Sequence, residues 1–426
     1  MTASQHAHAV SLTRFIDQSP SPYHVAQSAE RLLLDAGFTA TDGRSAGEPG
    51  RFVRSADGAL FAWVVPESAG PTTPFRVVGA HTDSPNLRLK PLPNAHTQGY
   101  ARASVEVYGG VLLNSWLDRD LGLSGRVTVR VGDRSEGRLV FLNEPLFRVP
   151  QLAIHLDRDV NNTGLVLNKH AHLRPIFGLE DGADDLMDLV AGELDVPRSD
   201  ILGADLMFHD TNPSGFVGVD DSFISAPRLD NQLSCHAAVT ALSGITDPDA
   251  IAIVALFDHE EVGSVSSSGA ATAATPVLLD QIADSRGATP ADRVASRAGS
   301  LLISADNAHA THPNYPERHD PGHRVMMNGG PVLKHNVNQR YTTDAHSAAT
   351  FHLAAERAGV PTQHFSNRAD LACGSTIGPT LAAGLGIRAL DMGCAQLAMH
   401  SCRELAGSED PWSMTLLLAE LLGGTG

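Results

Sequence analysis

Histidine and carboxylate side chains follow the apolar, strand-like runs of this chain at four places, and one further carboxylate opens a helical pattern. These residues are His81, Asp83, Asp230, Glu260, Glu261, Asp306 and His400. Any one of them alone is typical of a helix cap or a turn. Because the ends of parallel strands meet at one edge of a sheet, we expect the side chains to converge if the runs form a parallel sheet.

If these carboxylates converge, they require a bound cation, because unpaired charge is costly to bury. Mixed histidine and carboxylate ligation is typical of catalytic zinc, and the two oxygens of Asp230 would bridge two ions. Of the adjacent Glu260 and Glu261, one would ligate while the other faces the attacking water as general base. Asp83, two residues after His81, is expected to hold the free imidazole nitrogen.

The elements that must position these residues follow two different sequence patterns. Strand-like and helical patterns alternate in residues 1–91 and 227–426, which predicts an α/β fold with a mainly parallel sheet sandwiched by helices. Residues 92–226 contain short strand-like runs divided by Gly, Asp and Asn, which predicts an inserted, mostly β domain. Helices are expected at Ala26–Leu34, Asp184–Ala191, Leu229–Leu242, Leu278–Ala283, Thr343–Ala358 and Glu409–Leu422. A turn is expected at 161–164.

Composition narrows the class of protein. With 48 acidic and 31 basic residues, the formal net charge of −17 argues against nucleic acid or an anionic membrane as a partner. Four scattered cysteines without a C-x-x-C pair are typical of reduced thiols, so we expect a cytoplasmic protein. The first ten residues do not resemble a signal peptide and receive no role, and no apolar run is long enough for a bilayer.

With these motifs in order, the chain closely resembles the aspartyl aminopeptidases, which are di-zinc metallopeptidases of co-catalytic type. The matching stretches are 79–85 (GAHTDSP), 227–231 (PRLDN), 259–264 (HEEVGS), 304–310 (SADNAHA), 374–379 (GSTIGP) and 398–401 (AMHS). Further matches in the inserted part are 105–110, 116–120 and 152–156. The resemblance extends from near Phe15 to the last helix.

The resemblance implies two zinc ions per subunit, although Mn²⁺ or Co²⁺ can share such ligands. The implied ligands are His81 and Asp306 for one ion, Glu261 and His400 for the other, and Asp230 as the bridge. Glu260 would be the general base toward the metal-activated water, and Asp83 would orient His81. The reaction implied is removal of N-terminal Asp or Glu from peptides.

An acidic substrate side chain that enters a carboxylate-lined site must meet a cation. From the residues alone Lys334 is a surface lysine, whereas the family match makes Lys334, Tyr341 and His309 substrate contacts. Gly374 would let the backbone approach the substrate closely. The other nearby histidines are expected to be polar turn residues, and they are His312, His319, His323 and His335.

The resemblance also implies an assembly. The middle domain would drive subunit contact in a homododecamer, and His155 would reach the active site of a neighbouring subunit. Two alternatives remain. One is a related di-metal aminopeptidase or amidohydrolase of another specificity. An assay on substrates that differ in their N-terminal residue distinguishes it. The other is a non-catalytic cage or cargo protein, which predicts that metal ligands are lost.

Overall fold

The computed structural model describes residues 1–43, 46–182 and 185–423. Contacts divide the chain into two compact units. The first comprises Met1–Asp83, Ser214–Met399 and Leu405–Gly426, and the second comprises Ser84–Pro213 with the short segment His400–Glu404. The sequence pattern had placed the insertion at 92–226, whereas this second unit begins and ends earlier and includes a segment that lies far along the chain.

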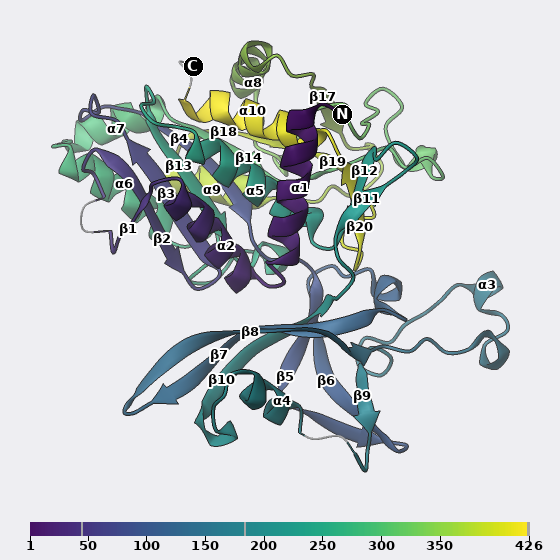
Figure 1. The fold of residues 1–426 in the computed structure, drawn as a ribbon. Coiled ribbons are helices and arrows are strands. Elements are labelled where there is room, and N and C mark those ends of the chain that lie inside the picture. Colours follow the sequence, from purple (N-terminus) through teal and green to yellow (C-terminus); the bar gives the residue numbers. More distant parts are fainter. Residues whose placement is uncertain (44–45, 183–184, 424–426) are drawn as a thin grey trace. The chain divides into compact units, whose positions relative to one another are not determined.

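The first unit is built on a nine-stranded sheet (Figure 1). Its strands, in spatial order, are β1 (Thr39–Ala40), β2 (Gly50–Ala56), β3 (Ala59–Val65), β13 (Ile251–Phe257), β4 (Phe75–His81), β14 (Leu301–Ala305), β18 (Arg388–Gly393), β16 (Val332–His335) and β17 (Gln363–Ser366). The central strands β13, β4, β14 and β18 pair in parallel. Antiparallel pairing joins β2 to β3, β3 to β13, and β16 to β18. The predicted mainly parallel sheet is therefore confirmed.

Helices pack on both faces of this sheet. One apolar core includes residues of α1 (Ala3–Asp17), α2 (Pro22–Asp35), α5 (Leu229–Ser243), α8 (Ala345–Ala358) and α10 (Asp410–Gly423). The other includes residues of α6 (Ala274–Ser285) and α9 (Ile377–Leu385), while α7 (Pro290–Ala298) precedes β14. Side chains of β3 alternate between the two cores, with Leu60 in one and Phe61 in the other. A strand buried on both sides needs such a continuous apolar run.

The N-terminal segment, to which the sequence analysis gave no role, begins α1. Thr2 caps the helix by accepting the backbone N–H of Gln5, and the Gln5 side chain accepts the backbone N–H of Thr2. This reciprocal pair satisfies two of the backbone donors that a helix start leaves without partners. His8 and Ala9 are buried in the same helix, so the first ten residues belong to the packed structure.

The second unit is a closed antiparallel barrel. Its strands, in order around the barrel, are β10 (Ile201–Asp210), β5 (Asn86–Thr97), β6 (Tyr100–Tyr108), β9 (Ile176–Leu179), β8 (Arg134–Arg148) and β7 (Asp120–Val131). Helix α4 spans Leu186–Glu193, close to the predicted helix, whose first residue, Asp184, lies outside the described residues. The expected turn at 161–164 instead contains a short helix, α3 (Val160–Thr163), which ends at Gly164 with a φ of 85°.

A smaller sheet follows the order β11 (Gly215–Val217), β12 (Phe223–Ala226), β20 (Glu404–Gly407), β19 (Ala395–Leu397) and β15 (Ala308–His309). Strand β15 starts two residues after Asp306, which directly follows β14 of the large sheet. Within the described ranges, the helices lack the length and apolar composition that a bilayer crossing needs.

Candidate metal centre

Three neighbouring parallel strands end at one edge of the large sheet. Strand β4 ends at His81, and its neighbour β13 ends at Phe257, the residue paired with His81. On the other side of β4, β14 ends at Ala305, so Asp306 is the next residue. Parallel strands present their carboxyl ends on the same side of a sheet, which is where ligands bind in open α/β folds. The topology therefore brings the predicted residues of three strands to one edge.

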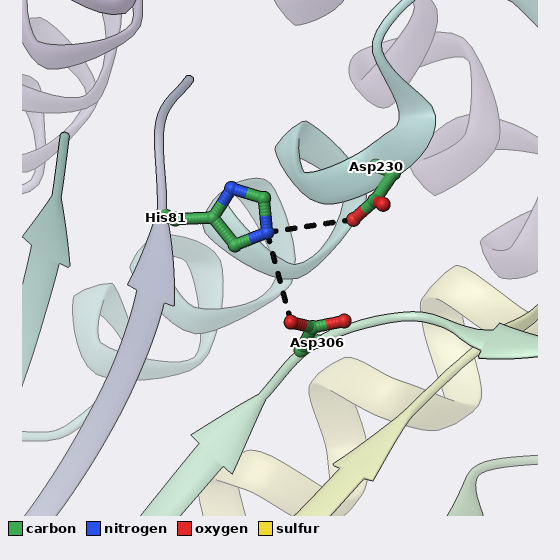
Figure 2. Close-up of side chains that lie close together, drawn as sticks. All are labelled: His81, Asp230 and Asp306. Carbon is green, nitrogen blue, oxygen red and sulfur yellow. Dashed lines mark ion pairs between the residues drawn. The ribbon is translucent and has the colours of Figure 1, made fainter. Parts of the chain in front are cut away.

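His81, Asp230 and Asp306 form the centre of this edge. Figure 2 shows the His81 ring pointing at both carboxylates, with Asp230 near the start of α5 and Asp306 just beyond β14. Nε2 of His81 lies 3.5 Å from Oδ1 of Asp230 and 3.7 Å from Oδ2 of Asp306. The side chains are 1%, 4% and 11% exposed, respectively. Two buried carboxylates thus approach one imidazole nitrogen.

The spacing of these three groups fits a zinc ion. Zinc–nitrogen and zinc–oxygen bonds of about 2.0–2.2 Å at tetrahedral angles separate neighbouring ligand atoms by roughly 3.3–3.6 Å. One ligand atom from each residue lies within 4.8 Å of the other two. The two distances from Nε2 of His81 are longer than good hydrogen bonds and close to this ligand separation. The donor set of one imidazole and two carboxylates therefore suits the metal.

The charge of the site supports the same conclusion. Burial lowers the pKa of His81, but the carboxylates of Asp230, Asp306 and Asp83 outweigh burial and raise that pKa well above 6.5. The carboxylates therefore stabilise a positive charge at this position, and a proton on His81 partly compensates their negative charge. A divalent ion would compensate it more fully and would leave His81 neutral, as metal ligation requires.

Asp83 contacts both His81 and the two glutamates. We had expected its side chain to hold the free imidazole nitrogen of His81, and the contacts differ in part from this. Nδ1 of His81 lies 3.0 Å from the backbone carbonyl oxygen of Asp83, whereas the nearest carboxylate oxygen is at 3.6 Å. The carboxylate itself accepts the backbone N–H groups of Glu260 and Glu261, each at 3.1 Å. A neutral His81 that donates Nδ1–H to this carbonyl keeps the Nε2 lone pair for a metal.

Glu260 and Glu261 lie in the short 3₁₀ helix Glu260–Val262, which follows β13. His259 precedes it with a φ of 66°, a left-handed conformation that turns the chain sharply after the strand. One carboxylate oxygen of each glutamate lies within 4.8 Å of a His81 nitrogen. Burial, offset by His81 and reinforced by neighbouring aspartates, raises the pKa of Glu260 to about 7. A carboxyl with that pKa can accept and return a proton near neutral pH.

Lys334 is not the surface lysine that the residues alone indicated. The residue is 2% exposed in β16, and its ammonium donates to Oδ1 of Asp306 at 3.3 Å and to the carbonyl oxygen of Asn307 at 3.2 Å. Nζ of Lys334 also lies 4.9 Å from the ring centre of Tyr341. Burial and Cys373 raise the pKa of Tyr341, so its hydroxyl remains a donor. A buried cation therefore stands beside the carboxylate cluster.

The remaining predicted residues are placed as follows. His309 is an exposed residue of β15, and its ring centre lies 6.2 Å from that of Phe365, which is equally far from Tyr341. Gly374 is exposed, and a Cβ there would meet no atom within 4 Å. His155 and His400 belong to the second unit. His155 is exposed, whereas Nδ1 of His400 lies 3.1 Å from the carbonyl oxygen of Gly110.

Two buried asparagines that the sequence motifs had not singled out lie next to predicted ligands. Asn231 donates its side-chain amide to the carbonyl oxygen of Ala305 at 2.8 Å, and Asn307 donates to the carbonyl oxygen of Leu229 at the same distance. Both residues are buried and each directly follows a predicted ligand, Asp230 or Asp306. The repeated Asp-Asn pair was the signal in the sequence, because it places a ligand next to an amide that ties two elements together.

Sequence and structure comparisons define the class of protein. Residues 15–421 match the family described as aminopeptidase I zinc metalloprotease (M18). The chain therefore belongs to the M18 family and is a zinc metallo-aminopeptidase. Because this family includes the aspartyl aminopeptidases, the resemblance noted in the sequence is confirmed.

Individual relatives cover the whole length. A probable M18 family aminopeptidase 2 from Streptomyces avermitilis is 47% identical over 428 residues, which cover 98% of each chain. The solved complex of Ape4 with Nbr1 contains a chain of 35% identity with a TM-score of 0.95, covering 99% of this chain and 86% of that one. The S. cerevisiae mApe1 dodecamer is 28% identical with a TM-score of 0.84, covering 98% and 96%.

Proposed function

We propose that this M18 aminopeptidase is an aspartyl aminopeptidase, which removes N-terminal Asp or Glu from peptides. The observation that carries the proposal is the buried ammonium of Lys334 beside the metal-ligand cluster. An ammonium has three donors, and two of them have partners in Asp306 and Asn307. The third donor would bind the carboxylate of an acidic substrate side chain, which would otherwise face a site lined with negative charge.

The metal ligands are proposed as a set. His81 and Asp306 would hold one zinc ion, Glu261 and His400 the other, and Asp230 would bridge them. The distances from Nε2 of His81 to Asp230 and Asp306 support the first of these positions. Two ions per subunit, and Mn²⁺ or Co²⁺ as substitutes, follow from the resemblance and from the softness of the donor set. Zinc, when bound, polarises the scissile carbonyl and makes a water molecule more acidic.

The chain's own residues would perform the proton transfers. Glu260 takes a proton from the water that attacks the scissile carbonyl, and it later delivers this proton to the leaving amine as the C–N bond breaks. Asp83 supports this role because its carboxylate accepts the backbone N–H of Glu260 and thereby fixes the start of the short helix. Burial raises the pKa of Glu260, which makes its carboxylate a better acceptor for a proton from water.

Substrate contacts are proposed around the same edge. The hydroxyl of Tyr341 and the ring of His309 would donate to substrate oxygens, and the exposed Gly374 would let the backbone approach. Cys373, which directly precedes Gly374, is hydrogen-bonded to Tyr341, and this contact supports a place for Gly374 near the same edge.

We also propose that the subunits assemble into a homododecamer, as the mApe1 neighbour does. His155 would then reach the active site of a neighbouring subunit. Its exposure in the 3₁₀ helix Ile154–Leu156, between the exposed Leu152 and Leu156, supports a role in subunit contact. The four cysteines are free thiols, which supports a cytoplasmic location.

The test is a steady-state assay on Asp-, Glu- and Leu-anilide substrates, with and without a metal chelator. We expect cleavage of the Asp and Glu substrates, little cleavage of the Leu substrate, loss of activity with chelator and recovery with Zn²⁺. Preferential cleavage of the Leu substrate would assign the enzyme to another aminopeptidase specificity. Absence of zinc after gentle purification, together with no cleavage of any substrate, would support the non-catalytic assembly protein.

A further inference from the structure

A cluster of histidines lies outside the site described above. His335 of β16, His364 of β17 and His352 of α8 come from three elements of the first unit. Nε2 of His335 lies 3.1 Å from Nδ1 of His364, and the ring centres of His352 and His364 are 5.0 Å apart. His335 was expected to be a polar turn residue, but it is the last residue of a strand that pairs with β17.

Strand geometry explains why these rings meet. In the parallel pairing of β16 with β17, His364 stands opposite Leu333 and His335 stands opposite Ser366. Residues that alternate along a strand share a face, so both histidines lie on the face of Leu333, whose core also includes residues of α8. Lys334 points to the other face. The histidine cluster therefore lies on the face of β16 opposite to the Lys334 side chain.

The nitrogen separation has a chemical meaning. Two imidazole nitrogens bound to one tetrahedral zinc ion, at about 2.0–2.1 Å each, lie roughly 3.3–3.4 Å apart. The 3.1 Å separation of His335 and His364 is close to this value. Their neutral rings now share one hydrogen, and binding of an ion moves that hydrogen to the other nitrogen of its ring. A third nitrogen requires the exposed His352 to turn its ring, whose centre lies 5.0 Å from that of His364.

The cluster is also held in the protonation state that metal binding requires. Burial, followed by the neighbouring rings of His364, His323 and His352, lowers the pKa of His335. Burial and the rings of His352 and His323 lower the pKa of His364 in the same way. The charged group that faces His323 is Asp320, whose Oδ1 lies 2.9 Å from Nδ1 of His323. Neutral imidazoles keep their lone pairs available at neutral pH.

We propose that His335, His364 and His352 form a second metal site, separate from the catalytic centre, that binds a borderline divalent transition ion such as Ni²⁺, Cu²⁺ or Zn²⁺. A donor set of imidazoles without a carboxylate selects these ions over Mg²⁺ and Ca²⁺. The proposal does not depend on the peptide specificity of the enzyme, because none of the three histidines belongs to the catalytic set.

The test measures Ni²⁺ bound per chain by equilibrium dialysis of the zinc-loaded full-length protein. We expect the wild-type protein to bind one ion more than His364→Ala and the double variant His335→Ala/His352→Ala. The exposed His96→Ala serves as the matched control and should bind like the wild type. Changes around a metal ligand already weaken binding by about tenfold to a hundredfold, so loss of a ligand should weaken it at least as much.

Cu²⁺ provides an independent readout. The electron paramagnetic resonance spectrum of the Cu²⁺-loaded protein should carry the coupling of three imidazole nitrogens, and His352→Ala should reduce this to two. Equal Ni²⁺ binding by wild type and His364→Ala would overturn the proposal. So would a Cu²⁺ spectrum that His352→Ala leaves unchanged. Circular dichroism of each variant separates loss of a ligand from loss of the fold.

Discussion

The carboxylate of Asp83 accepts the backbone N–H of Glu260 at 3.1 Å, and so joins the end of β4 to the segment that follows β13. Its second oxygen accepts the N–H of Glu261 at the same distance. One buried carboxylate therefore sets the position of both the proposed base and a proposed ligand. Charge-assisted hydrogen bonds of this kind are among the stronger ones, which makes the pair of glutamates rigid before substrate binds.

Asp83→Asn should separate positioning from charge. The amide has a single oxygen, so it can accept only one of the two N–H groups and turns its NH₂ toward the other. We expect kcat to fall by about tenfold to a hundredfold while zinc content stays near that of the wild type. Kinetics and metal analysis of the same preparation check this. A variant with unchanged kcat would show that the two hydrogen bonds do not position Glu260.

Glu260→Gln should remove the proposed base and keep the size of the side chain. Glutamine cannot take a proton from water, so we expect turnover to fall by roughly 10²–10⁴-fold with zinc retained. Glu260→Asp is the useful comparison, because it keeps a carboxylate but shortens its reach. If Glu260→Gln keeps near wild-type turnover, another group is the base.

Lys334→Met tests the specificity proposal. Methionine fills a similar volume without the ammonium, so the carboxylate of an acidic substrate loses a charged hydrogen bond worth about 1.5–3 kcal/mol. We expect kcat/KM to fall by roughly 10- to 150-fold on Asp- and Glu-anilides, and much less on the Leu substrate. Equal losses on all three would instead show that Lys334 acts only by holding Asp306, the partner of its ammonium.

His400→Ala tests the proposed division of ligands. In the proposal, His400 contributes to one ion only, so the variant should keep the ion held by His81 and Asp306. We expect about one zinc ion per chain after dialysis against weak chelator, compared with two for the wild type. His81→Ala is the complementary variant. Full zinc content in His400→Ala would remove His400 from the ligand set.

Acid should destabilise the fold through three buried histidines. Burial lowers the pKa of His8 and His24 to about 4 and that of His236 to about 3. Between pH 6.5 and 4 the unfolded chain binds protons at these rings while the folded chain does not. The free energy of unfolding should therefore fall with decreasing pH, by up to about 1.4 kcal/mol per pH unit for each ring.

Urea unfolding at several pH values, with chelator present throughout, measures this slope without a contribution from metal loss. His8→Asn should reduce the slope by the share of one histidine, because an asparagine does not titrate. His96→Gln, at an exposed histidine, should leave the slope unchanged. A slope that is the same for His8→Asn and the wild type would contradict the assignment to His8.

Much of the catalytic edge could be predicted because strand patterns and parallel topology together determine where polar strand ends meet. His81 and Asp306 are examples, since each follows a continuous apolar run. Lys334 could not be placed from the residues alone, because β16 is four residues long and runs antiparallel to β18. Its neighbours Gly330 and Pro331 read as a turn. The α1 helix was missed since its polar start, beginning at Ala3, gives little apolar periodicity.

Strand β16 presents Lys334 to one side and His335 to the other. The pairing of this short strand with β18 and β17 thus decides whether an ammonium or an imidazole faces the carboxylates. A shift of the pairing register by one residue would turn each side chain of β16 to the opposite face. Lys334 would then point away from the carboxylates, although the sequence had not changed. Just before this strand, the backbone of Gly330 has a φ of 85° and lies so close to Pro361 that a Cβ would be 2.0 Å from its carbonyl oxygen, so only glycine fits there. The proposed selectivity for acidic peptides would then depend on the register of a strand only four residues long.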